Sequence, residues 1–381
     1  MVRYRFWHIF LFLGLAAVLG CGQGLQGRSD GAEVLLPWPD AQGDYHFTKV
    51  VLSTLSSPQK MDGPAARIFW QVGGKKAGGF RGQPVKPHLT RRGRLWLATD
   101  VQSQQAIATY AIFERLQRFD RQLGFESRLA WPREVGFDIK IKTPEGSLHS
   151  NAAYDRAGDV VAVAAYSSSH ESAGLPLAVN HGVLSHEHFH AHFAAVSGGR
   201  AGAAQFALSN RSLLGIVNRL VIGSWNEGLA DLYATVFTGD PMFMRMSFVN
   251  QAQERALSLP VTALINWVDL KRMMDCTGPC LTATQMQGFQ YVNGTALARW
   301  LYQWGLQLHP TNGPREVLSE VLRTLPQILN EALPVLDLQA IESDYFIESF
   351  LNKQNLPIPA ESCRELRSKL VGRAAVFRGC P

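Results

Sequence analysis

The sequence predicts an α+β fold, in which a small β-rich segment precedes a mixed α/β lobe and a mainly helical lobe. Three patterns carry this prediction. Short apolar runs interrupted by Gly and Pro, typical of strands, fill residues 46–100. An apolar period of three and four residues starts near residue 103, and helical patterns dominate after residue 196. The length of 381 residues and the hydrophobic content of 46% allow one large or two small domains with a sizeable core.

The first 45 residues are predicted to lie outside the fold. Residues 1–20 form a signal peptide, since Arg3 and Arg5 precede an apolar run, Phe6–Leu19, that is too short for a comfortable transmembrane helix. The run continues into Gly20-Cys21 and resembles a bacterial lipobox, which implies a lipid on Cys21. This predicts a lipid-anchored protein of the bacterial cell envelope, on the outer membrane facing the periplasm. The alternative is an ordinary signal peptide followed by a chance cysteine. Residues 21–45, rich in Gly, Asp, Gln and Pro, are predicted to be a flexible tether.

The β-rich segment, residues 46–100, contains three apolar runs that predict strands. They are Val50–Leu52, Arg67–Val72 and Arg94–Ala98. No residue pattern in this segment indicates chemistry.

The next lobe, residues 101–196, begins with an amphipathic helix over Ser103–Leu123, for which Ser103 is the expected N-cap. Strands are then expected at Ile139–Ile141, from Asn151, and over Val160–Tyr166. A helix that carries several histidines ends this lobe.

That helix contains the sequence His186-Glu187-His188-Phe189-His190, which is H-E-x-x-H. Residues four apart share a helix face, so His186 and His190 can hold one metal ion, while Glu187 can take a proton from a water on that ion. His188 and His192 have the same spacing but point the other way, and no carboxylate follows the first of them, so they are interpreted as neighbours of the site. The alternative is a histidine-rich surface helix.

The last lobe, residues 197–381, carries Glu227 and Asp231, which are four apart on an otherwise apolar helix. Two carboxylates in such surroundings are costly to bury unless a cation or donor compensates them. Glu227 is therefore the expected third ligand of one zinc ion, and Asp231 the acceptor of a ligating histidine's second ring N–H. A solvated charge pair is the alternative.

These motifs, His186–His190 and Glu227–Asp231, resemble the H-E-x-x-H and E-x-x-x-D signature of the gluzincin metallopeptidases. The resemblance implies the zincin catalytic fold, with an edge strand that binds substrate. Asn151 and Ala152 start a segment that is similar to this strand in thermolysin-like enzymes, which implies that they bind substrate backbone. Tyr291-Val292-Asn293-Gly294 looks like the helix start that supplies the oxyanion-stabilising tyrosine of aminopeptidase-like members. Two family features are not found in the sequence. One is the segment that recognises a free amino terminus in aminopeptidases, and its absence favours an endopeptidase. The other is the set of acidic clusters that form the calcium sites of thermolysin-like enzymes.

Further helices are expected over Tyr291–Trp304, Pro314–Leu325, Leu338–Leu351 and Glu361–Val371. Four cysteines remain beyond residue 21. An even number in an exported chain permits two disulfides. Pairing of Cys276 with Cys280 and of Cys363 with Cys380 is preferred among three possible connectivities, and a zinc site of all four thiolates is less favoured in an oxidising compartment.

The sequence thus indicates a zinc metallopeptidase that acts on a peptide or protein and contacts the membrane through its lipidated N-terminus. The alternative from another class is a zinc-bound peptide-binding or structural lipoprotein without catalysis, against which the intact Glu187 argues. Hydrolysis of an ester or epoxide is a third possibility for the same site. The net charge of +6 is mild and accompanies no nucleic-acid motif, so nucleic acid is not an expected partner.

Overall fold

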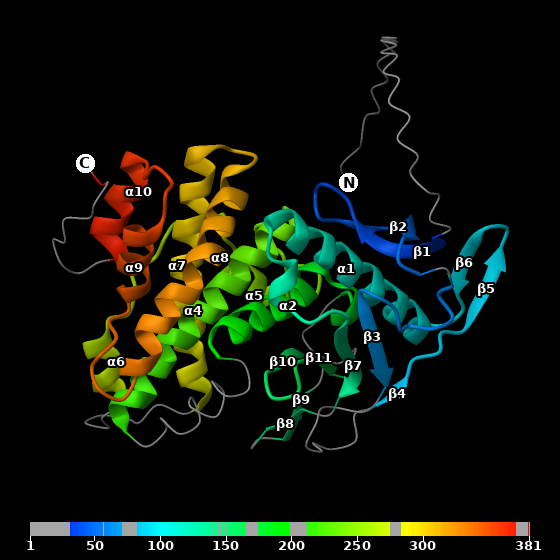
Figure 1. Cartoon of the computed structure of the whole chain (residues 1–381), viewed down its shortest axis with the longest axis horizontal. Helices are drawn as coiled ribbons and strands as arrows, with labels where there is room; N and C mark the ends of the chain where they lie inside the picture. The colour runs from blue at the N-terminus through cyan, green and yellow to red at the C-terminus, as the bar shows by residue number, and fades with distance from the viewer. Residues whose placement is uncertain are drawn as a thin grey trace, which may run out of the picture.

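The computed structural model describes residues 31–55, 57–70, 82–139, 141–143, 146–148, 151–164, 174–198, 212–274, 283–370 and 380. Across them the chain is α+β, as the sequence predicts, with the strands on one side and most helices on the other (Figure 1). The predicted signal peptide, Cys21 with its predicted lipid, and the predicted pair of Cys276 and Cys280 lie outside the described residues. No helix among the described residues is both long and apolar enough to cross a membrane.

A four-stranded sheet with the order β2-β1-β6-β5 opens the fold. Its strands are β1 (Ala32–Pro39), β2 (Tyr45–Leu52), β5 (Leu89–Arg92) and β6 (Leu95–Ala98). Strand β1 contradicts the tether predicted over residues 21–45. Val34 and Leu36 alternate with less buried residues along it and are almost fully buried, and this period of two is the physical reason for a strand. Residues 32–39 therefore belong to the fold and not to a tether.

The second sheet has five strands in the order β10-β11-β7-β3-β4. They are β3 (Ala66–Trp70), β4 (Gln83–Pro84), β7 (Arg133–Ile139), β10 (Ala152–Asp155) and β11 (Val160–Ala164). Strands β3, β7 and β11 run parallel, whereas β10 pairs antiparallel with β11 and forms one edge. A separate hairpin consists of β8 (Ile141–Thr143) and β9 (Gly146–Leu148).

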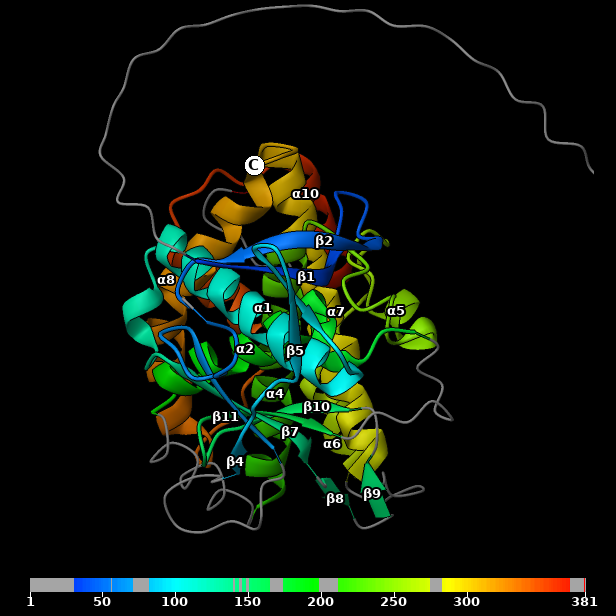
Figure 2. The same cartoon turned by 90° about the vertical axis from the view of Figure 1, so that its right-hand side faces the viewer.

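Helix α1 (Val101–Leu123) lies between the two sheets (Figure 2). The sequence analysis expected Ser103 to be the N-cap of this helix, but the structure places Ser103 inside its first turn. Asp100 takes that position, because its carboxylate accepts a hydrogen bond from Ser103 N at 2.7 Å and a second from Ser103 Oγ at 2.9 Å. The helix ends at Gly124, whose φ of 83° is the left-handed conformation that glycine adopts without strain.

The remaining helices form the larger part of the molecule. They are α2 (His181–Val196), α4 (Leu213–Thr238), α5 (Val249–Glu254), α6 (Trp267–Met274), α7 (Ala283–Leu308), α8 (Gly313–Ala332), α9 (Tyr345–Lys353) and α10 (Ala360–Glu365), with short turns of other helix types at Glu126–Arg128, Leu177–Val179, Leu333–Val335 and Leu366–Leu370. Helix α7 begins eight residues before Tyr291, so the expectation that Tyr291 starts a helix is wrong. The helix predicted over Leu338–Leu351 corresponds to α9, which begins later than expected, at Tyr345.

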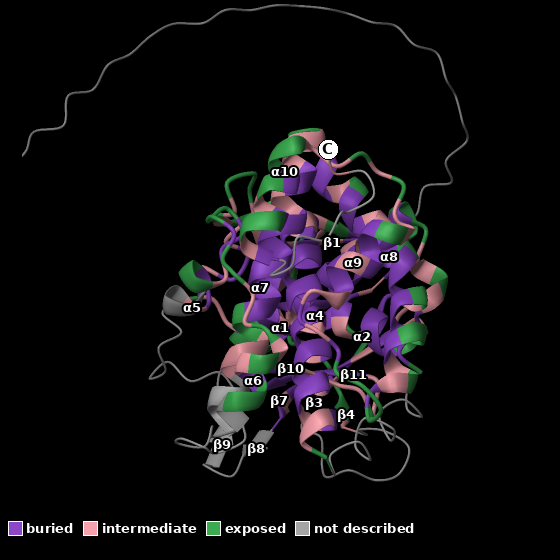
Figure 3. Cartoon of the chain, turned by 90° about the vertical axis from the view of Figure 1, so that its left-hand side faces the viewer, coloured by how far each residue is buried: buried purple, intermediate pink, exposed green. Residues whose placement is uncertain are grey.

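Helices α4 and α7 cross at two glycines, in the buried centre of the helical part (Figure 3). A Cβ added to Gly228 would lie 2.1 Å from Gly294 O, and one added to Gly294 would lie 2.7 Å from Gly228 N. Only glycine therefore allows the two backbones to come this close. Because Glu227 precedes Gly228 and Tyr291 lies one helical turn before Gly294, this crossing brings both side chains to one region.

The substitution Gly294→Ala is expected to lower the free energy of unfolding by about 1–3 kcal/mol, because the new methyl group overlaps backbone atoms that cannot rotate away. Gly288→Ala on the same helix is the matched control. A Cβ at Gly288 meets no atom within 4 Å, so the higher helix propensity of alanine should raise stability by about 0.5–1 kcal/mol. Denaturant unfolding of both variants measures the difference, and equal stabilities would contradict the close crossing.

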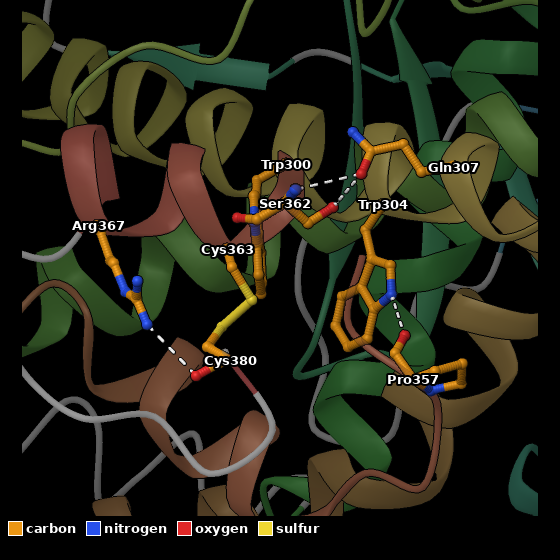
Figure 4. Close-up of a disulfide and its surroundings, with 8 residues drawn as sticks. All are labelled: Trp300, Trp304, Gln307, Pro357, Ser362, Cys363, Arg367 and Cys380. Atoms are coloured by element: carbon orange, nitrogen blue, oxygen red, sulfur yellow. Dashed lines mark hydrogen bonds between the residues drawn. A yellow bond between two sulfur atoms is a disulfide. The ribbon is translucent and has the colours of Figure 1, made fainter. Parts of the chain in front are cut away.

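The C-terminal tail is tied to α10 by a disulfide between Cys363 and Cys380, whose Cα atoms lie 5.6 Å apart (Figure 4). This pairing agrees with the sequence prediction. The helix that carries Cys363 is fixed to α7, since Trp300 Nε1 donates to Ser362 O at 3.2 Å and Ser362 Oγ donates to Gln307 Oε1 at 2.7 Å. The disulfide therefore joins the tail to the packed helical part.

Candidate metal centre

Helix α2 lies in the middle of the fold and is buried on nearly every side. Its start is fixed by Asn180, whose side-chain oxygen accepts hydrogen bonds from Gly182 N and Val183 N, while its amide nitrogen donates to Ser247 Oγ. A helix enclosed in this way presents side chains to different neighbours on its different faces. The two histidine pairs consequently face separate environments.

His186 and His190 project toward α4, where they meet Glu227. The two Nε2 atoms lie 3.1 Å apart. Glu227 closes the group, with Oε2 at 3.3 Å from His186 Nε2 and Oε1 at 3.7 Å from His190 Nε2. Glu187 Oε2 is 4.0 Å from His190 Nε2. The structure thus brings together the four residues that the sequence analysis named from two separate motifs.

The donor set and its spacing fit a zinc ion. Tetrahedral zinc with bonds of about 2.0–2.2 Å requires neighbouring ligand atoms to lie about 3.3–3.5 Å apart. The three separations among His186, His190 and Glu227 lie within a few tenths of an ångström of that range. Glu227 retains 17% side-chain exposure and His190 retains 10%, so solvent reaches part of the group. Three ligands and an open position are the pattern of catalytic zinc sites.

The outward ring nitrogens of both histidines have polar neighbours on α4. His190 Nδ1 lies 3.0 Å from Asn226 Oδ1, and His186 Nδ1 lies 3.0 Å from Asp231 Oδ1 as an ion pair without good hydrogen-bond alignment. Such partners orient ligating imidazoles and raise their basicity. The sequence analysis named Asp231 but missed Asn226, although a polar residue directly before Glu227 on an apolar helix was a usable signal.

Arg255, directly after α5, is a further residue that the sequence analysis missed. Its guanidinium donates two hydrogen bonds to the Asp231 carboxylate and lies 3.5 Å from Glu227 Oε2. It also lies over the ring of Tyr291, 4.6 Å from the ring centroid. Arg255 therefore supplies the cation that the buried carboxylates Glu227 and Asp231 require. A single arginine in a short helix-to-loop segment carries no local pattern that would have identified it.

The electrostatics of the group follow from these contacts. Burial opposes the charged form of His186, and so does Arg255, but Asp231 and Glu227 outweigh both and raise the pKa of His186 to about 9. Burial also opposes ionisation of Glu227, yet the charges of His190 and His186 and the hydrogen bond from His186 lower the pKa of Glu227 to about 2. Without a metal, a proton on His186 thus balances part of the negative charge.

Zinc binding at pH 7 is therefore expected to release about one proton per chain, because a protonated imidazole cannot ligate a metal. Since the folded pKa of His186 lies above its ordinary value, the protonated ring stabilises the metal-free fold fully below pH 6.5, and this contribution is lost as the pH rises through 9. Zinc affinity should rise over the same range. Calorimetric titration with zinc in two buffers of different ionisation enthalpy measures the proton; identical heats would contradict the prediction.

The sequence analysis also named Tyr291, Asn151 and Ala152, and the structure places them on α7 and at the start of β10. Tyr291 is inside α7 and 38% exposed. Desolvation and the nearby charge of Glu227 raise the pKa of Tyr291, so its hydroxyl keeps its proton. Ala152 begins the edge strand β10, which contacts α2, and the Asn151 carbonyl accepts from Ala164 N at 2.7 Å. The structure describes no substrate contact for these residues.

A second group of metal-ligand type among the described residues consists of Asp120, His188 and His192. All three are completely buried. Both Nε2 atoms point at one oxygen, Asp120 Oδ2, at 2.8 and 2.9 Å, and the Tyr233 hydroxyl donates to the other oxygen. Within the described part of the chain neither Nδ1 has a hydrogen-bond partner, whereas ligating histidines almost always donate that proton. We interpret this group as a buried carboxylate held by hydrogen bonds from three side chains.

This group, which we call the Asp120 network, links three helices. Asp120 comes from α1, the histidines from α2 and Tyr233 from α4. Burial opposes the charge of Asp120, but His192 and His188 outweigh it and hold the pKa of Asp120 well below its usual range. The network binds the face of α2 that is opposite to His186 and His190. Its hydrogen bonds therefore fix the rotation of α2 about its axis relative to α4.

No protein-family model matches the chain, and a search of curated proteins finds no match. The function of the centre formed by His186, His190 and Glu227 is therefore inferred from its own geometry and chemistry.

Proposed function

We propose that this chain is a zinc-dependent metallopeptidase of the gluzincin type, an endopeptidase on the zincin fold, anchored to the bacterial envelope by a lipid on Cys21. One observation carries the proposal. The Nε2 atoms of His186 and His190 and the carboxylate of Glu227 converge at zinc-ligand spacing, with Glu187 beside them and part of the group in contact with solvent. A zinc-binding module or structural site has no need of a carboxylate beside an open position.

The edge strand β10 supports a peptide as substrate. It contacts α2 and has a pairing partner, β11, on one side. An extended peptide can add to such an edge through backbone hydrogen bonds, which bind it independently of its sequence. Asn151 and Ala152, at the start of β10, are the residues that we assign to this contact. The peptide would then pass the open side of the centre.

In the proposed reaction, zinc held by His186, His190 and Glu227 would supply Lewis-acid chemistry, lowering the pKa of a water and polarising a peptide carbonyl. Glu187 takes the proton of the attacking water and then gives it to the leaving amine. Tyr291 donates a hydrogen bond to the carbonyl oxygen as negative charge develops there. Asp231 and Asn226 hold the two imidazoles in orientation, and Arg255 forms ion pairs with Asp231 and Glu227.

Cleavage of unstructured casein by the purified protein tests the proposal. We expect hydrolysis that a chelator abolishes and added zinc restores. A zinc-loaded protein that binds casein peptides without cutting them would assign the chain to the binding-module alternative. Hydrolysis of ester or epoxide substrates without any peptide cleavage would keep the centre catalytic but overturn the peptidase assignment.

The substitution Tyr291→Phe is expected to lower kcat by about 10²–10³-fold, as loss of one oxyanion-hole donor does elsewhere, with unchanged zinc content and melting temperature. The ring that packs against Arg255 remains in this variant. Tyr302→Phe, three turns further along α7, is the matched control and should retain activity. Casein cleavage rates at saturating substrate measure both variants, and equal rates would remove Tyr291 from the mechanism.

A further inference from the structure

The outer face of the four-stranded sheet carries apolar and basic side chains that point away from the core. Strand β2 contributes Phe47, which is 64% exposed, Val51, which is 52% exposed, and Lys49 between them. Residues at alternate positions of a strand lie on one face, so these three form a row. Large apolar side chains that are this exposed on one face of a strand are a sign of an interaction surface.

The neighbouring strands extend this face. The register pairs Phe47 with Pro37, Lys49 with Leu35 and Val51 with Glu33 across β1, and Glu33 with Leu95 on β6. Arg92 on β5 pairs with Leu95 and completes the row. Leu35, Pro37 and Leu95 are only partly buried. Together with Leu97, which follows Leu95 at the next outward position, these residues form what we call the outer sheet face.

The opposite face of the same sheet is the one that packs on the protein. Val34 and Leu36 are buried in the core, and Trp96 packs against it. Helix α1 contacts β1, β2 and β6, and Figure 2 shows α1 on the inner side of β1 and β2. The alternation therefore places apolar residues on both faces of the sheet. Within the described part of the chain, only the inner face packs against another element, helix α1. A sheet in water normally presents polar residues on its free face.

The charges on and beside the outer sheet face are mostly positive. Lys49, Arg92 and Arg94 are all exposed; Arg92 ends β5, and Arg94 lies in the tight turn before β6. Among the described residues of the outer sheet face, the acidic side chain is that of Glu33, which is partly buried. Apolar side chains with basic residues around them match the interface of a bilayer that contains anionic lipid.

The proposed attachment point, Cys21, is close in the sequence to the first strand of this sheet. Ten peptide units separate Cys21 from Gly31, which directly precedes β1. Ten residues span at most about 33–36 Å when extended, and about 16–19 Å on average as a flexible chain. A lipid on Cys21 would therefore hold the sheet near the bilayer, where even a weak surface affinity is effective because the local concentration is high.

We propose that the outer sheet face docks on an anionic lipid bilayer, with Phe47 and Val51 in the interfacial region and Lys49, Arg92 and Arg94 against lipid phosphates. The proposal rests on the lipid anchor of the proposed function. Docking would turn the tethered chain into one with a fixed orientation, in which the sheet lies against the membrane and the metal centre faces away from it across α1.

Flotation with lipid vesicles tests the surface without the anchor. The lipid-free chain from Gly22 is suitable, because it keeps every residue that the structure describes. We expect it to float with vesicles of equal phosphatidylglycerol and phosphatidylethanolamine, and to bind phosphatidylcholine vesicles more weakly. The double variant Phe47→Ser/Val51→Ser should reduce the vesicle-bound fraction about tenfold, and Lys49→Glu should remove the preference for anionic lipid. Leu338→Ser, at an exposed leucine of the helical part, is the control and should bind like the unchanged chain.

Three outcomes would overturn the proposal. They are flotation that is equal for the unchanged chain and the double variant, no flotation at any lipid concentration, and a dimer that the double variant breaks, since a dimer assigns the face to a second copy. Casein cleavage by the lipid-free chain and the intact mass of the membrane-extracted protein, which should show acyl chains on Cys21, are measured separately. A failed surface is thereby distinguished from a failed enzyme or a missing anchor.

Discussion

Replacing Glu187 with Gln is expected to lower kcat/KM for peptide cleavage by about 10²–10⁴-fold while one zinc per chain remains bound. The reason is position. Glu187 Oε2 lies 4.0 Å from Nε2 of His190, near enough to reach a water on the proposed zinc ion, whereas Glu227 is the carboxylate that we propose as a ligand. Loss of a general base costs a factor of this size. The amide of Gln keeps the size of the side chain but accepts no proton at neutral pH.

The measurement pairs casein cleavage with zinc analysis on the same preparation. Glu361→Gln, at an exposed glutamate of α10, is the matched control and should keep both activity and zinc. A Glu187→Gln variant that cleaves casein at the unchanged rate would remove Glu187 as the base. If the variant loses its zinc, Glu187 acts as a ligand and the assignment of Glu227 must be revised.

The second large effect is expected on stability. Asp120→Ala should lower the free energy of unfolding by about 3–5 kcal/mol, the range for removal of one partner from a buried charged network. His188, His192 and Tyr233 would each lose an acceptor in a place that water does not reach. An unsatisfied buried donor costs about 1–3 kcal/mol, so three of them account for the size of the effect.

A graded series checks this explanation by denaturant unfolding. Tyr233→Phe removes one donor and leaves the carboxylate with two, so we expect a loss of about 1.5–3 kcal/mol. Asp337→Ala, at an exposed aspartate, is the control and should change stability by no more than about 0.5 kcal/mol. If Asp120→Ala unfolds like the control, the network does not fix α2, and the second metal-type group requires another explanation.

The parts of the centre that follow from the sequence are those within one helix. His186 and His190 are four residues apart, and so are Glu227 and Asp231, so each pair shares a face once the helix forms. What places the pairs against each other is the packing of α2 on α4, and the glycine crossing of α4 with α7 adds Tyr291 to the same region. No local pattern encodes that packing. The sequence predicted which residues to look for, and the resemblance of both motifs to one family predicted that they meet.

The missed residues differ in how much signal they carry. Asp120 lies four residues after Leu116 on the apolar face of the predicted helix 103–123, and an acid at a core position indicates a buried partner. His188 and His192 were seen, but without Asp120 their purpose could not be stated. Arg255 has no such signal, because its role depends on the fold that brings the end of α5 to Asp231.

The errors in the fold lie where local composition and tertiary contacts compete. Residues 32–39 are surrounded by Gly, Asp, Gln and Pro, which favoured a tether, yet Val34 and Leu36 find a core to enter and form β1. Helix α7 begins at Ala283, but the residues from Ala283 to Gln290 carry no sequence marker of a helix start. The family resemblance at Tyr291 therefore gave the wrong boundary.

The most direct test of the central claim is a crystal structure of the purified protein with diffraction recorded on both sides of the zinc absorption edge. We expect one anomalous peak per chain, with His186 Nε2, His190 Nε2 and a Glu227 oxygen within about 2.0–2.2 Å of it, and the peak should vanish in Glu227→Ala. A peak enclosed by Asp120, His188 and His192, or a peak that survives at full height in Glu227→Ala, would contradict this assignment of the metal centre.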